Sequence, residues 1–587
     1  MPIEGNPLVN PPKPIGLAVW VDGLEPYYVT DWERMQEDWC QFLDSGEPLL
    51  FHNAPFDLSV GLKWLGGEQP HWSRVHDTIF ILFQADPYSP SLSLKPSAER
   101  YLDLPPNEQD ELHEWILANV PEATPKNAGA YIYRAPVELV RKYAIGDVVR
   151  TKQVFDLLYR DYGSEPYDRE RELAPILTEN SVKGIRVDRE QLEEDYNTCL
   201  ESMSAADERI YQILGCEPFN IGSGPQLAER LDKAGLVDEW ILTPKGRRST
   251  AKDNLIKVCK DQDLVDLLAY RKTMQTCTGT FMGPWLAFSE EDGRVHTEWN
   301  QVANDEGVHA GTRTGRLSSS RPNFQNPPNP FGLTIPEDLS PLPVMRRYLL
   351  PEEGHRWIKR DFSSQEIRIL AHFEDGPLMR ASQDDPFLDP HSMAQELIKE
   401  ITSNWYERKD VKITGFSIIY GSGVPGLAQQ LGRPRGVAHD LREAYFKAMP
   451  AAANLAASTR NRGRSGGAVR TWGGREYFVE PPKMINGRMR SFEYKLLNYL
   501  IQGSAGDQTK QVLIDWHERK HPDSVLMTTI HDEINASVPE ELWEHQMMCL
   551  RETMDQDYFD VPMRSEGFYG PNWGDLTELS REEDYGL

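Results

Sequence analysis

The sequence has no long apolar run, no closely paired cysteines and no excess of positive charge. A transmembrane helix needs roughly 20 consecutive apolar residues, so this absence excludes a protein anchored by such a helix. The first residues, MPIEGNPLVN, contain no basic segment followed by an apolar one, and no signal peptide is expected. The six cysteines form no C-x-x-C pair, which argues against a zinc site or disulfide framework and favours a reducing, cytoplasmic setting.

The formal net charge of −28 argues against a simple DNA-coating protein, because a polyanion is bound by a basic footprint. It does not exclude an enzyme that acts on nucleic acid. Such an enzyme needs only local positive charge, and it also needs carboxylates to hold metal ions. We therefore expect the acidic excess on outer faces and a basic cleft.

The length of 587 residues predicts three to five domain-sized units. In the first 165 residues, apolar runs bounded by turns precede a helical pattern from about 137 to 162, which predicts a compact α/β domain. Residues 169–286 are mostly helical in pattern. The stretch TGRLSSSRPNFQNPPNP contains too much Pro, Ser and Asn for a long helix. A second α/β region follows from about residue 345, with a helical insertion at roughly 376–465.

Asp361 is the first candidate for chemistry. The run IKRDFSSQEIRILAHF predicts a strand, then a turn, then a helix, with Asp361 at the end of the strand. A carboxylate in that place can present its oxygens to a metal ion. Equally, Asp361 or Ser363 could simply cap the helix.

Four residues of RKDVKITGFSIIYG form the second candidate. Arg408, Lys412, Phe416 and Tyr420 are spaced four apart and therefore share one face of a helix. Two cations and two aromatic rings on one face could bind the phosphates and the base of a nucleoside triphosphate. An ordinary amphipathic helix has the same pattern.

The third candidate is His531-Asp532-Glu533, which lies between two β-rich runs and predicts a hairpin with acids at its tip. An exposed turn is the alternative. Together, however, the three candidates meet one chemical requirement. Two-metal phosphoryl transfer needs carboxylates that bridge two metal ions, here Asp361 and Asp532, and cations on the leaving group, here Arg408 and Lys412.

At this point the sequence resembles the family A DNA polymerases, of the bacterial DNA polymerase I type and especially their bacteriophage members. The resemblance is carried by five ordered segments: residues 361–368 (DFSSQEIR), 408–421, 530–533 (IHDE), 314–319 (TGRLSS) and 498–510 (NYLIQGSAGDQTK). It implies an α/β multidomain protein, with a ribonuclease-H-like 3′–5′ exonuclease fold followed by a right-hand polymerase. The implied parts are exonuclease-like 1–165, thumb 166–300, palm 301–375 and 481–587, and fingers 376–480.

The resemblance implies a nucleotidyltransferase that extends a primer on DNA template with dNTPs, in phage replication or in repair. It implies two Mg²⁺ ions, which Mn²⁺ can replace, and primer–template DNA as partner. It further implies a monomer in the cytoplasm, that of the bacterial host if the protein is phage-encoded. A processivity partner is not identified by the sequence.

Individual roles follow from the same resemblance. The catalytic residues are Asp361, Asp532, Glu533 and Lys412, with metal ions on Asp361, Asp532 and the carbonyl of Phe362. The nucleotide contacts are Glu366, His391, Arg408, Lys412, Phe416 and Tyr420. Glu366 matches the residue that blocks a ribose 2′-OH, and Phe416 implies discrimination against dideoxynucleotides. The primer–template contacts are Arg316, Asn498, Gln502 and His531. Ser364-Gln365 departs from the Gln-Ile of many members.

We interpret five arginines that lie among glycines as phosphate contacts, with a mobile solvated loop as the alternative: Arg460, Arg462, Arg464, Arg470 and Arg475.

The first 165 residues resemble the family's proofreading exonuclease, which holds two metal ions with four carboxylates. Asp57 and Asp147 match two of these acids, Tyr143 matches the phenol near the attacking water, and Asp77 is an additional acid nearby. The first motif should be Asp-x-Glu. Glu4 fits its glutamate, but Pro2 stands at the aspartate position and offers no ligand. We therefore expect weak or absent proofreading.

Two alternatives stay open from the sequence. A single-subunit RNA polymerase shares the two aspartates and the Arg/Lys helix, although Glu366 and the exonuclease-like region speak against it. A nuclease or DNA-binding accessory factor with a dead polymerase module is the other, against which the intact motifs speak.

Overall fold

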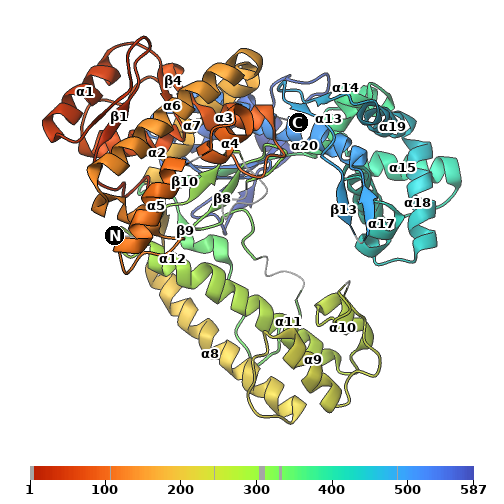
Figure 1. Ribbon diagram of the computed structural model, residues 1–587. Helices are drawn as coiled ribbons and strands as arrows, with labels where there is room; N and C mark the ends of the chain where they lie inside the picture. Colours follow the sequence, from red (N-terminus) through yellow and green to blue (C-terminus); the bar gives the residue numbers. More distant parts are fainter. Residues whose placement is uncertain are drawn as a thin grey trace.

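The computed structural model describes residues 6–105, 107–243, 245–302, 311–328, 333–485 and 487–586. The chain forms a central body from which a helical arm and a second, mostly helical lobe extend on either side of an open hollow (Figure 1). The arm carries α8 to α12, and the lobe carries α14 to α19. No described helix is long and apolar enough to cross a membrane.

The N-terminal part of the body pairs short strands with helices. β1 (Leu17–Val19) and β2 (Tyr27–Val29) are antiparallel, whereas β3 (Leu49–Phe51) and β4 (Val75–Asp77) are parallel. Around them lie α1 (Trp32–Asp44), α2 (Ala54–Trp64), α3 (Thr78–Ala85), α4 (Leu94–Leu102), α5 (Asn107–Asn119) and α6 (Val137–Tyr162). The helix predicted from 137 to 162 is confirmed.

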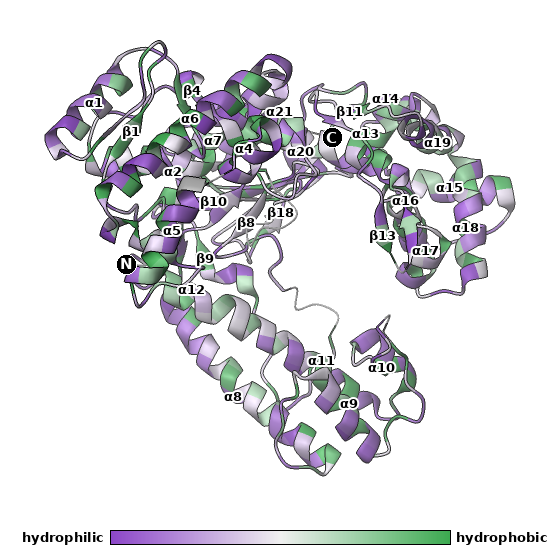
Figure 2. Cartoon of the chain, in the orientation of Figure 1, coloured by the Kyte–Doolittle hydropathy of each residue, from purple (hydrophilic) through white to green (hydrophobic). Residues whose placement is uncertain are grey.

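The arm is built on two long helices, α8 (Arg189–Leu214) and α11 (Gln262–Thr276). The buried residues of α8, among them Leu192, Ala206 and Ile210, recur at helical spacing. Figure 2 shows the resulting hydrophilic and hydrophobic bands along α8. The remaining arm helices are α9 (Gly224–Lys233), α10 (Lys252–Val258), a π-helical segment (Cys277–Met282) and α12 (Gly283–Phe288).

A five-stranded antiparallel sheet lies at the centre, in the order β15-β16-β10-β17-β18. Its strands are β10 (His355–Phe362), β15 (Val525–Ile530), β16 (Glu533–Pro539), β17 (Ser565–Gly570) and β18 (Thr577–Glu578). Helices α7 (Glu165–Lys183), α13 (Gln365–Glu374), α20 (Leu496–Arg519) and α21 (Trp543–Met554) complete this region. The strand–turn–helix around Asp361 and the hairpin around Asp532 are both confirmed.

The second lobe holds the predicted helical insertion. It comprises α14 (Pro377–Asp384), α15 (Pro390–Thr402), α16 (Arg408–Ile419), α17 (Val424–Leu431), α18 (Arg435–Ala448) and α19 (Pro450–Arg464). Two small hairpins follow, β11–β12 (Val469–Arg470 with Glu476–Tyr477) and β13–β14 (Lys483–Ile485 with Arg488–Arg490).

Candidate active site

Asp361 and Asp532 lie side by side because three strands of the central sheet bring them together. β10 pairs with β16 so that Asp361 stands opposite Glu533. The turn between β15 and β16 carries Asp532, whose carbonyl oxygen accepts a hydrogen bond from the Phe362 N–H at 3.2 Å. His531, at φ 55°, turns the chain at this point. Two aspartates that are 171 positions apart in sequence thus form one carboxylate pair.

The electrostatics of this pair favour a cation. Burial raises the pKa of Asp361, and the neighbouring carboxylates of Asp532 and Glu533 raise it further. Burial also raises the pKa of Asp532. Within the described ranges, neither side chain has an ion pair or a hydrogen bond to another residue's side chain. Carboxylate oxygens are the ligands that Mg²⁺ prefers, so the pair fits a divalent cation.

The described residues do not by themselves form a complete metal cage. Among the residues that the structure describes, no cluster of three or more His, Cys, Asp or Glu side chains could hold a metal ion. The fit therefore rests on the two aspartates, and further ligands would have to be backbone carbonyls, water or substrate.

Glu533 is held firmly by its neighbours, and sequence reasoning did not identify them. Its Oε1 accepts hydrogen bonds from Asn535 Nδ2 at 2.7 Å and from Trp573 Nε1 at 3.1 Å. Its Oε2 lies 3.5 Å from Lys359 Nζ and 3.7 Å from Arg346 Nη1. Lys359 precedes Asp361 by two residues on one strand, so the two side chains lie on the same face of the sheet. This spacing could have identified Lys359 from the sequence.

The second candidate helix is α16, with Arg408, Lys412 and Phe416 on it and Tyr420 at its end. The rings of Phe416 and Tyr420 stack at 6.0 Å between centroids, and Lys412 Nζ lies 6.0 Å from the Phe416 ring. Arg408 Nε is 2.6 Å from Asp389, a partner that the sequence did not reveal. Burial alone would raise the pKa of Asp389, but hydrogen bonds from Arg408, from Ser392 and from a backbone N–H lower it to about 2.

His391 lies beneath this helix and is 2% exposed. Its ring is 5.8 Å from that of Phe416. Burial lowers the pKa of His391 to about 4, against the opposing effect of Asp389. The imidazole is therefore neutral near pH 7, so it can make hydrogen bonds but no ion pair.

Glu366 links Arg316 to Tyr420 at the end of α16. Arg316 Nη2 donates to Glu366 Oε1 at 2.6 Å, and the Tyr420 hydroxyl approaches the same oxygen at 3.4 Å. Glu366 Oε2 is buried and has no hydrogen-bond partner among the described atoms. These contacts bring Arg316, Glu366 and Tyr420 into one wall.

Helix α20 aligns the other predicted contact residues. Gln502 hydrogen-bonds the hydroxyl of Tyr420, and Thr509 Oγ1 donates to the carbonyl of His531 at 3.3 Å. Asn498 lies one turn before Gln502 and has a buried amide oxygen without a partner among the described atoms. The structure therefore groups Asn498, Gln502 and His531 along one helix and its neighbouring turn.

One of the five arginines was assigned wrongly. Arg475 is 2% exposed and lies 2.8 Å from Asp507 and 2.9 Å from Glu170. Lys510 also binds Glu170, at 2.6 Å, so these four charges form a buried network that joins α7 to α20. Arg475 cannot contact phosphate from this position. The other four arginines are at least partly exposed.

The N-terminal region holds a second set of carboxylates. Asp77 is buried, and its oxygens accept the backbone N–H groups of Asn53 and Ala54 at 3.0 and 2.7 Å. Burial, followed by the charges of Asp77 and Asp147, raises the pKa of Asp57. Lys95 Nζ lies 2.8 Å from Asp147 and 4.0 Å from the centre of the Tyr143 ring. Pro2 and Glu4 lie outside the described residues.

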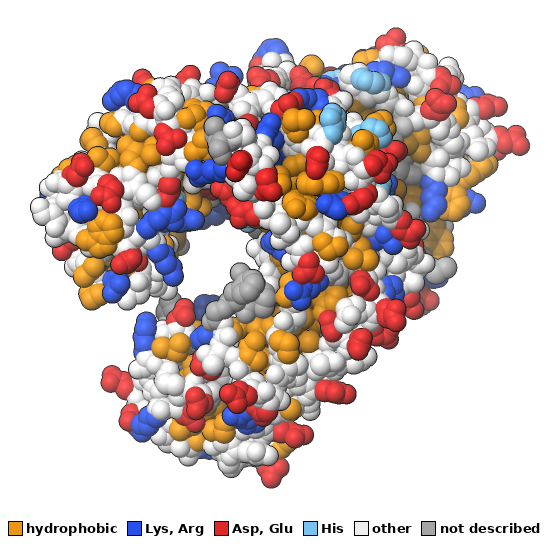
Figure 3. All heavy atoms as spheres, turned by 180° about the vertical axis from the view of Figure 1, so that it is seen from behind, with side chains coloured by type: hydrophobic (Ala, Val, Ile, Leu, Met, Phe, Trp, Pro, Cys, Tyr) orange, Lys and Arg blue, Asp and Glu red, His pale blue; other side chains and the backbone are white. Residues whose placement is uncertain are grey.

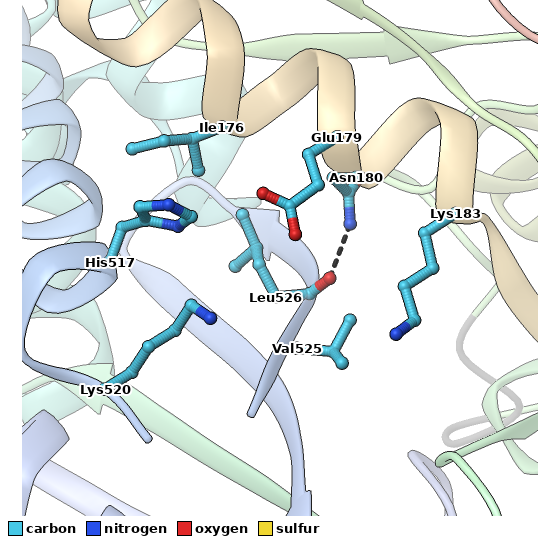
Figure 4. Close-up of a pocket in the computed structure, with 8 residues that line it drawn as sticks. All are labelled: Ile176, Glu179, Asn180, Lys183, His517, Lys520, Val525 and Leu526. Carbon is cyan, nitrogen blue, oxygen red and sulfur yellow. Dashed lines mark hydrogen bonds between the residues drawn. The ribbon is translucent and has the colours of Figure 1, made fainter. Parts of the chain in front are cut away.

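Two further features lie at the surface: charged side chains around the hollow and a groove beside α7. Figure 3 shows lysine and arginine side chains along the rim of the central hollow, and acidic side chains scattered over the face seen in this view. A small open groove lies between α7, the end of α20 and the start of β15 (Figure 4). Asn180, Lys183 and Lys520 line it. The groove is at the opposite end of β15 from His531, so it does not belong to the carboxylate site.

Known proteins resemble this chain in sequence and in fold. The family model described as DNA polymerase family A matches residues 189–575. DNA polymerase I of Chloroflexus aurantiacus is 31% identical over 565 residues, which cover 92% of this chain and 56% of that protein. DNA polymerase I of Bacillus caldotenax is 31% identical over 421 residues, 69% of this chain and 45% of that protein. The chain thus spans about half the length of these relatives.

A solved structure has a similar fold. It is described as the POL domain of Pol1 from M. smegmatis in complex with DNA primer-template and dNTP, and it has a TM-score of 0.76 at 23% identity. The similarity covers 96% of this chain and 93% of that chain. The family match over most of the sequence is decisive: this chain belongs to DNA polymerase family A.

Proposed function

We propose that the protein is a template-directed DNA polymerase, which extends a primer 3′ end with dNTPs. The observation that carries the proposal is the buried Asp361–Asp532 pair, for which the described residues provide no ion-pair partner, together with the cationic, aromatic face of α16. The relatives named as DNA polymerase I and the neighbour solved with primer-template and dNTP support this reading.

Metal ions belong to this proposal. We propose that Asp361, Asp532 and the Phe362 carbonyl hold two Mg²⁺ ions, which Mn²⁺ can replace. Bound there, divalent ions would activate the primer 3′ hydroxyl and neutralise charge on the phosphates. The interactions of Glu533 with Lys359, Arg346, Asn535 and Trp573 support a role in fixing β16, and hence the turn that carries Asp532.

The triphosphate would lie along α16. Lys412 has no ion-pair partner in the described part of the chain, so its ammonium is available to phosphate oxygens. Arg408 would leave Asp389 to bind a phosphate, or would bind Asp389 and a phosphate at the same time. The neutral His391 imidazole would add a hydrogen bond to the triphosphate. Such fixed donors stabilise the charge that develops on the leaving pyrophosphate.

Glu366, Tyr420 and Phe416 would select the sugar of the incoming nucleotide. Glu366 is held by Arg316 and approached by Tyr420, which leaves little freedom for its side chain to move aside for a ribose 2′-OH. Arg316, Asn498, Gln502 and His531 would contact the primer–template beside it. Contacts of this kind in the minor groove depend little on sequence, as a polymerase requires.

Proofreading by the N-terminal region would be weak or absent. The support is twofold. Pro2 offers no metal ligand, and the ammonium of Lys95 binds Asp147 where a metal-binding carboxylate should be available. We further propose the domain division given above, action as a monomer, and a role in replication or repair, with a phage origin as the specific prediction.

Nucleotide choice tests the proposal. Primer extension on a DNA template with Mg²⁺ should proceed with dNTPs and be at least about a hundredfold slower with rNTPs. Replacing Glu366 by Ala should narrow that difference by accelerating rNTP incorporation. Equal use of both substrates by the unmodified protein would contradict the proposal, and so would an absence of extension.

A further inference from the structure

The chain continues past the region that matches the family model, which ends at residue 575. β18 (Thr577–Glu578) pairs with β17 at the edge of the central sheet, and the short helix α22 (Arg581–Tyr585) follows it. Ser580 and Glu583 form a capping box at the start of α22. In Figure 1 the C-terminus lies near α14, the helix that precedes the loop contacted by α22.

Asp584 anchors α22 to the strand that carries Asp361. Its two carboxylate oxygens accept hydrogen bonds from Nη1 and Nη2 of Arg360, both at 2.8 Å. Arg360 is fully buried and Asp584 is nearly so, which makes this a bidentate pair shielded from water. Arg360 Nε also donates to Ser565 Oγ at 2.9 Å. Because side chains alternate along a strand, Arg360 holds β10 from the face opposite to that of Asp361.

Tyr585, the last residue of α22, contacts the loop that leads into α15. Its ring lies edge-on to the ring of Phe387, with 4.9 Å between the centroids. Its hydroxyl donates to Asp555 Oδ2 at 2.6 Å and accepts the N–H of Ser565 at 3.2 Å. These hydrogen bonds fix the tyrosine on the central body, so its ring gives Phe387 a fixed surface to pack against.

The loop that contains Phe387 ends at two residues of the proposed triphosphate site. Asp389 follows Phe387 by two positions, caps α15 by accepting the His391 N–H at 3.1 Å, and pairs with Arg408 at 2.6 Å. Arg368 of α13 holds the same loop by donating to a loop carbonyl at 2.8 Å. A displacement of the loop would therefore move Asp389 and His391 relative to α16.

Stabilising the fold is one role for these contacts, but their location favours a role in the site. α22 is bound both to the strand of a proposed metal ligand and to the loop before a proposed triphosphate contact. These two elements belong to different parts of the fold, and one helix of five residues links them.

We propose that α22 positions the triphosphate site, with Tyr585 as the positioning residue for the loop that ends at Asp389 and His391. Tyr585 acts through Phe387 and does not touch the nucleotide, whereas Asp584 keeps α22 in place on β10. Loss of the tyrosine ring should therefore weaken dNTP binding more than it slows the chemical step. The inference rests on the proposed polymerase function.

Two substitutions at Tyr585 separate the ring from the hydroxyl in single-nucleotide primer extension. Tyr585→Ala removes the contact with Phe387 and should raise KM for dNTP about fivefold, with kcat within about twofold of the unmodified protein. Tyr585→Phe retains the ring and should keep both constants within about twofold. All rates are measured well below the melting temperature of each variant, so that a smaller folded fraction does not imitate the effect.

Asp584→Asn tests the anchor of α22. It should raise the same KM, because α22 is held less firmly on β10. The double variant Asp584→Asn/Tyr585→Ala should be little worse than Tyr585→Ala alone, since both substitutions act through one helix. If Asp584→Asn does not fold, the two variants of Tyr585 still decide.

Tyr27→Ala is the matched control, because it removes another tyrosine hydroxyl bound to an aspartate, Asp38 at 3.0 Å, in the N-terminal region. It should leave both constants unchanged. An unchanged KM in Tyr585→Ala would overturn the inference, and so would an equal rise in Tyr585→Phe or a fall in kcat alone. Failure of the unmodified protein to extend any primer would instead contradict the proposed polymerase function.

Discussion

The protein contains two groups of carboxylates, and they differ in where the nearest lysine lies. In the central sheet, Asp361 and Asp532 face each other, while Lys359 approaches Glu533 and Lys412 stands on α16. In the N-terminal region, Lys95 binds Asp147 directly at 2.8 Å. One group thus keeps its negative charge available for a cation, whereas the other is partly neutralised from within. Both groups consist of acidic residues with lysines nearby. The position of the Lys95 ammonium beside Asp147 is the reason that we expect primer extension at the first group and little excision at the second.

Removing one acid from each group should give the largest difference in primer extension. Asp532→Ala should reduce primer extension on the order of a thousandfold or more, because one of two metal-binding carboxylates is lost. Asp147→Ala should leave extension within about twofold. Single-turnover extension of a labelled primer measures both. A wild-type rate for Asp532→Ala would disprove the assignment.

The lysines give the second test. Lys412→Ala should lower kcat/KM for dNTP about a hundredfold, since a fixed cation near the leaving phosphates stabilises the transition state. Lys409→Ala, an exposed lysine on another side of the same helix, is the matched control and should change little. Equal effects of the two substitutions would mean that α16 contributes only general positive charge.

A smaller effect is expected at Lys359. Lys359→Met removes the ammonium beside Glu533 and should slow extension about tenfold, with partial recovery in Lys359→Arg. The melting temperature should fall only slightly, because Asn535 and Trp573 still hold Glu533. A Lys359→Met enzyme with a normal rate at every Mg²⁺ concentration would show that Lys359 is merely structural.

The smallest effect concerns Lys95. Lys95→Met should destabilise the N-terminal region by about 1–2 kcal/mol, because Asp147 loses its ion pair near Asp57 and Asp77. Mn²⁺ should raise the melting temperature more in this variant than in the unmodified protein, in which only the Asp361–Asp532 site is open to the ion. Thermal melts with and without Mn²⁺ distinguish the two, and an identical Mn²⁺ response would argue that Lys95 does not exclude metal.

Local sequence patterns were enough to predict several parts of the fold and site. The strand before Asp361, the shared face of Arg408, Lys412 and Phe416, and the hairpin at Asp532 each depend on neighbours within a few positions. Their periodicity is therefore visible in the sequence.

Contacts between distant segments could not be predicted in the same way. Arg475 lies among glycines like a surface arginine, yet its partner Glu170 is 305 positions away and only folding buries both. Lys359 meets Glu533 through the register of β10 against β16, and Arg408 meets Asp389 through the packing of α15 and α16. Lys95 and Asp147 are likewise joined only in the folded chain.

We expect the Asp361–Asp532 site to carry out nucleotide addition and the Asp57–Asp147 site to carry out little excision. The most direct measurement is to give the unmodified protein, with Mg²⁺, the same primer–template carrying either a matched or a mismatched 3′ end, and to follow extension and excision together. The expected result is rapid extension of the matched end and little excision of the mismatched nucleotide. Rapid excision, or failure to extend the matched end, would contradict it.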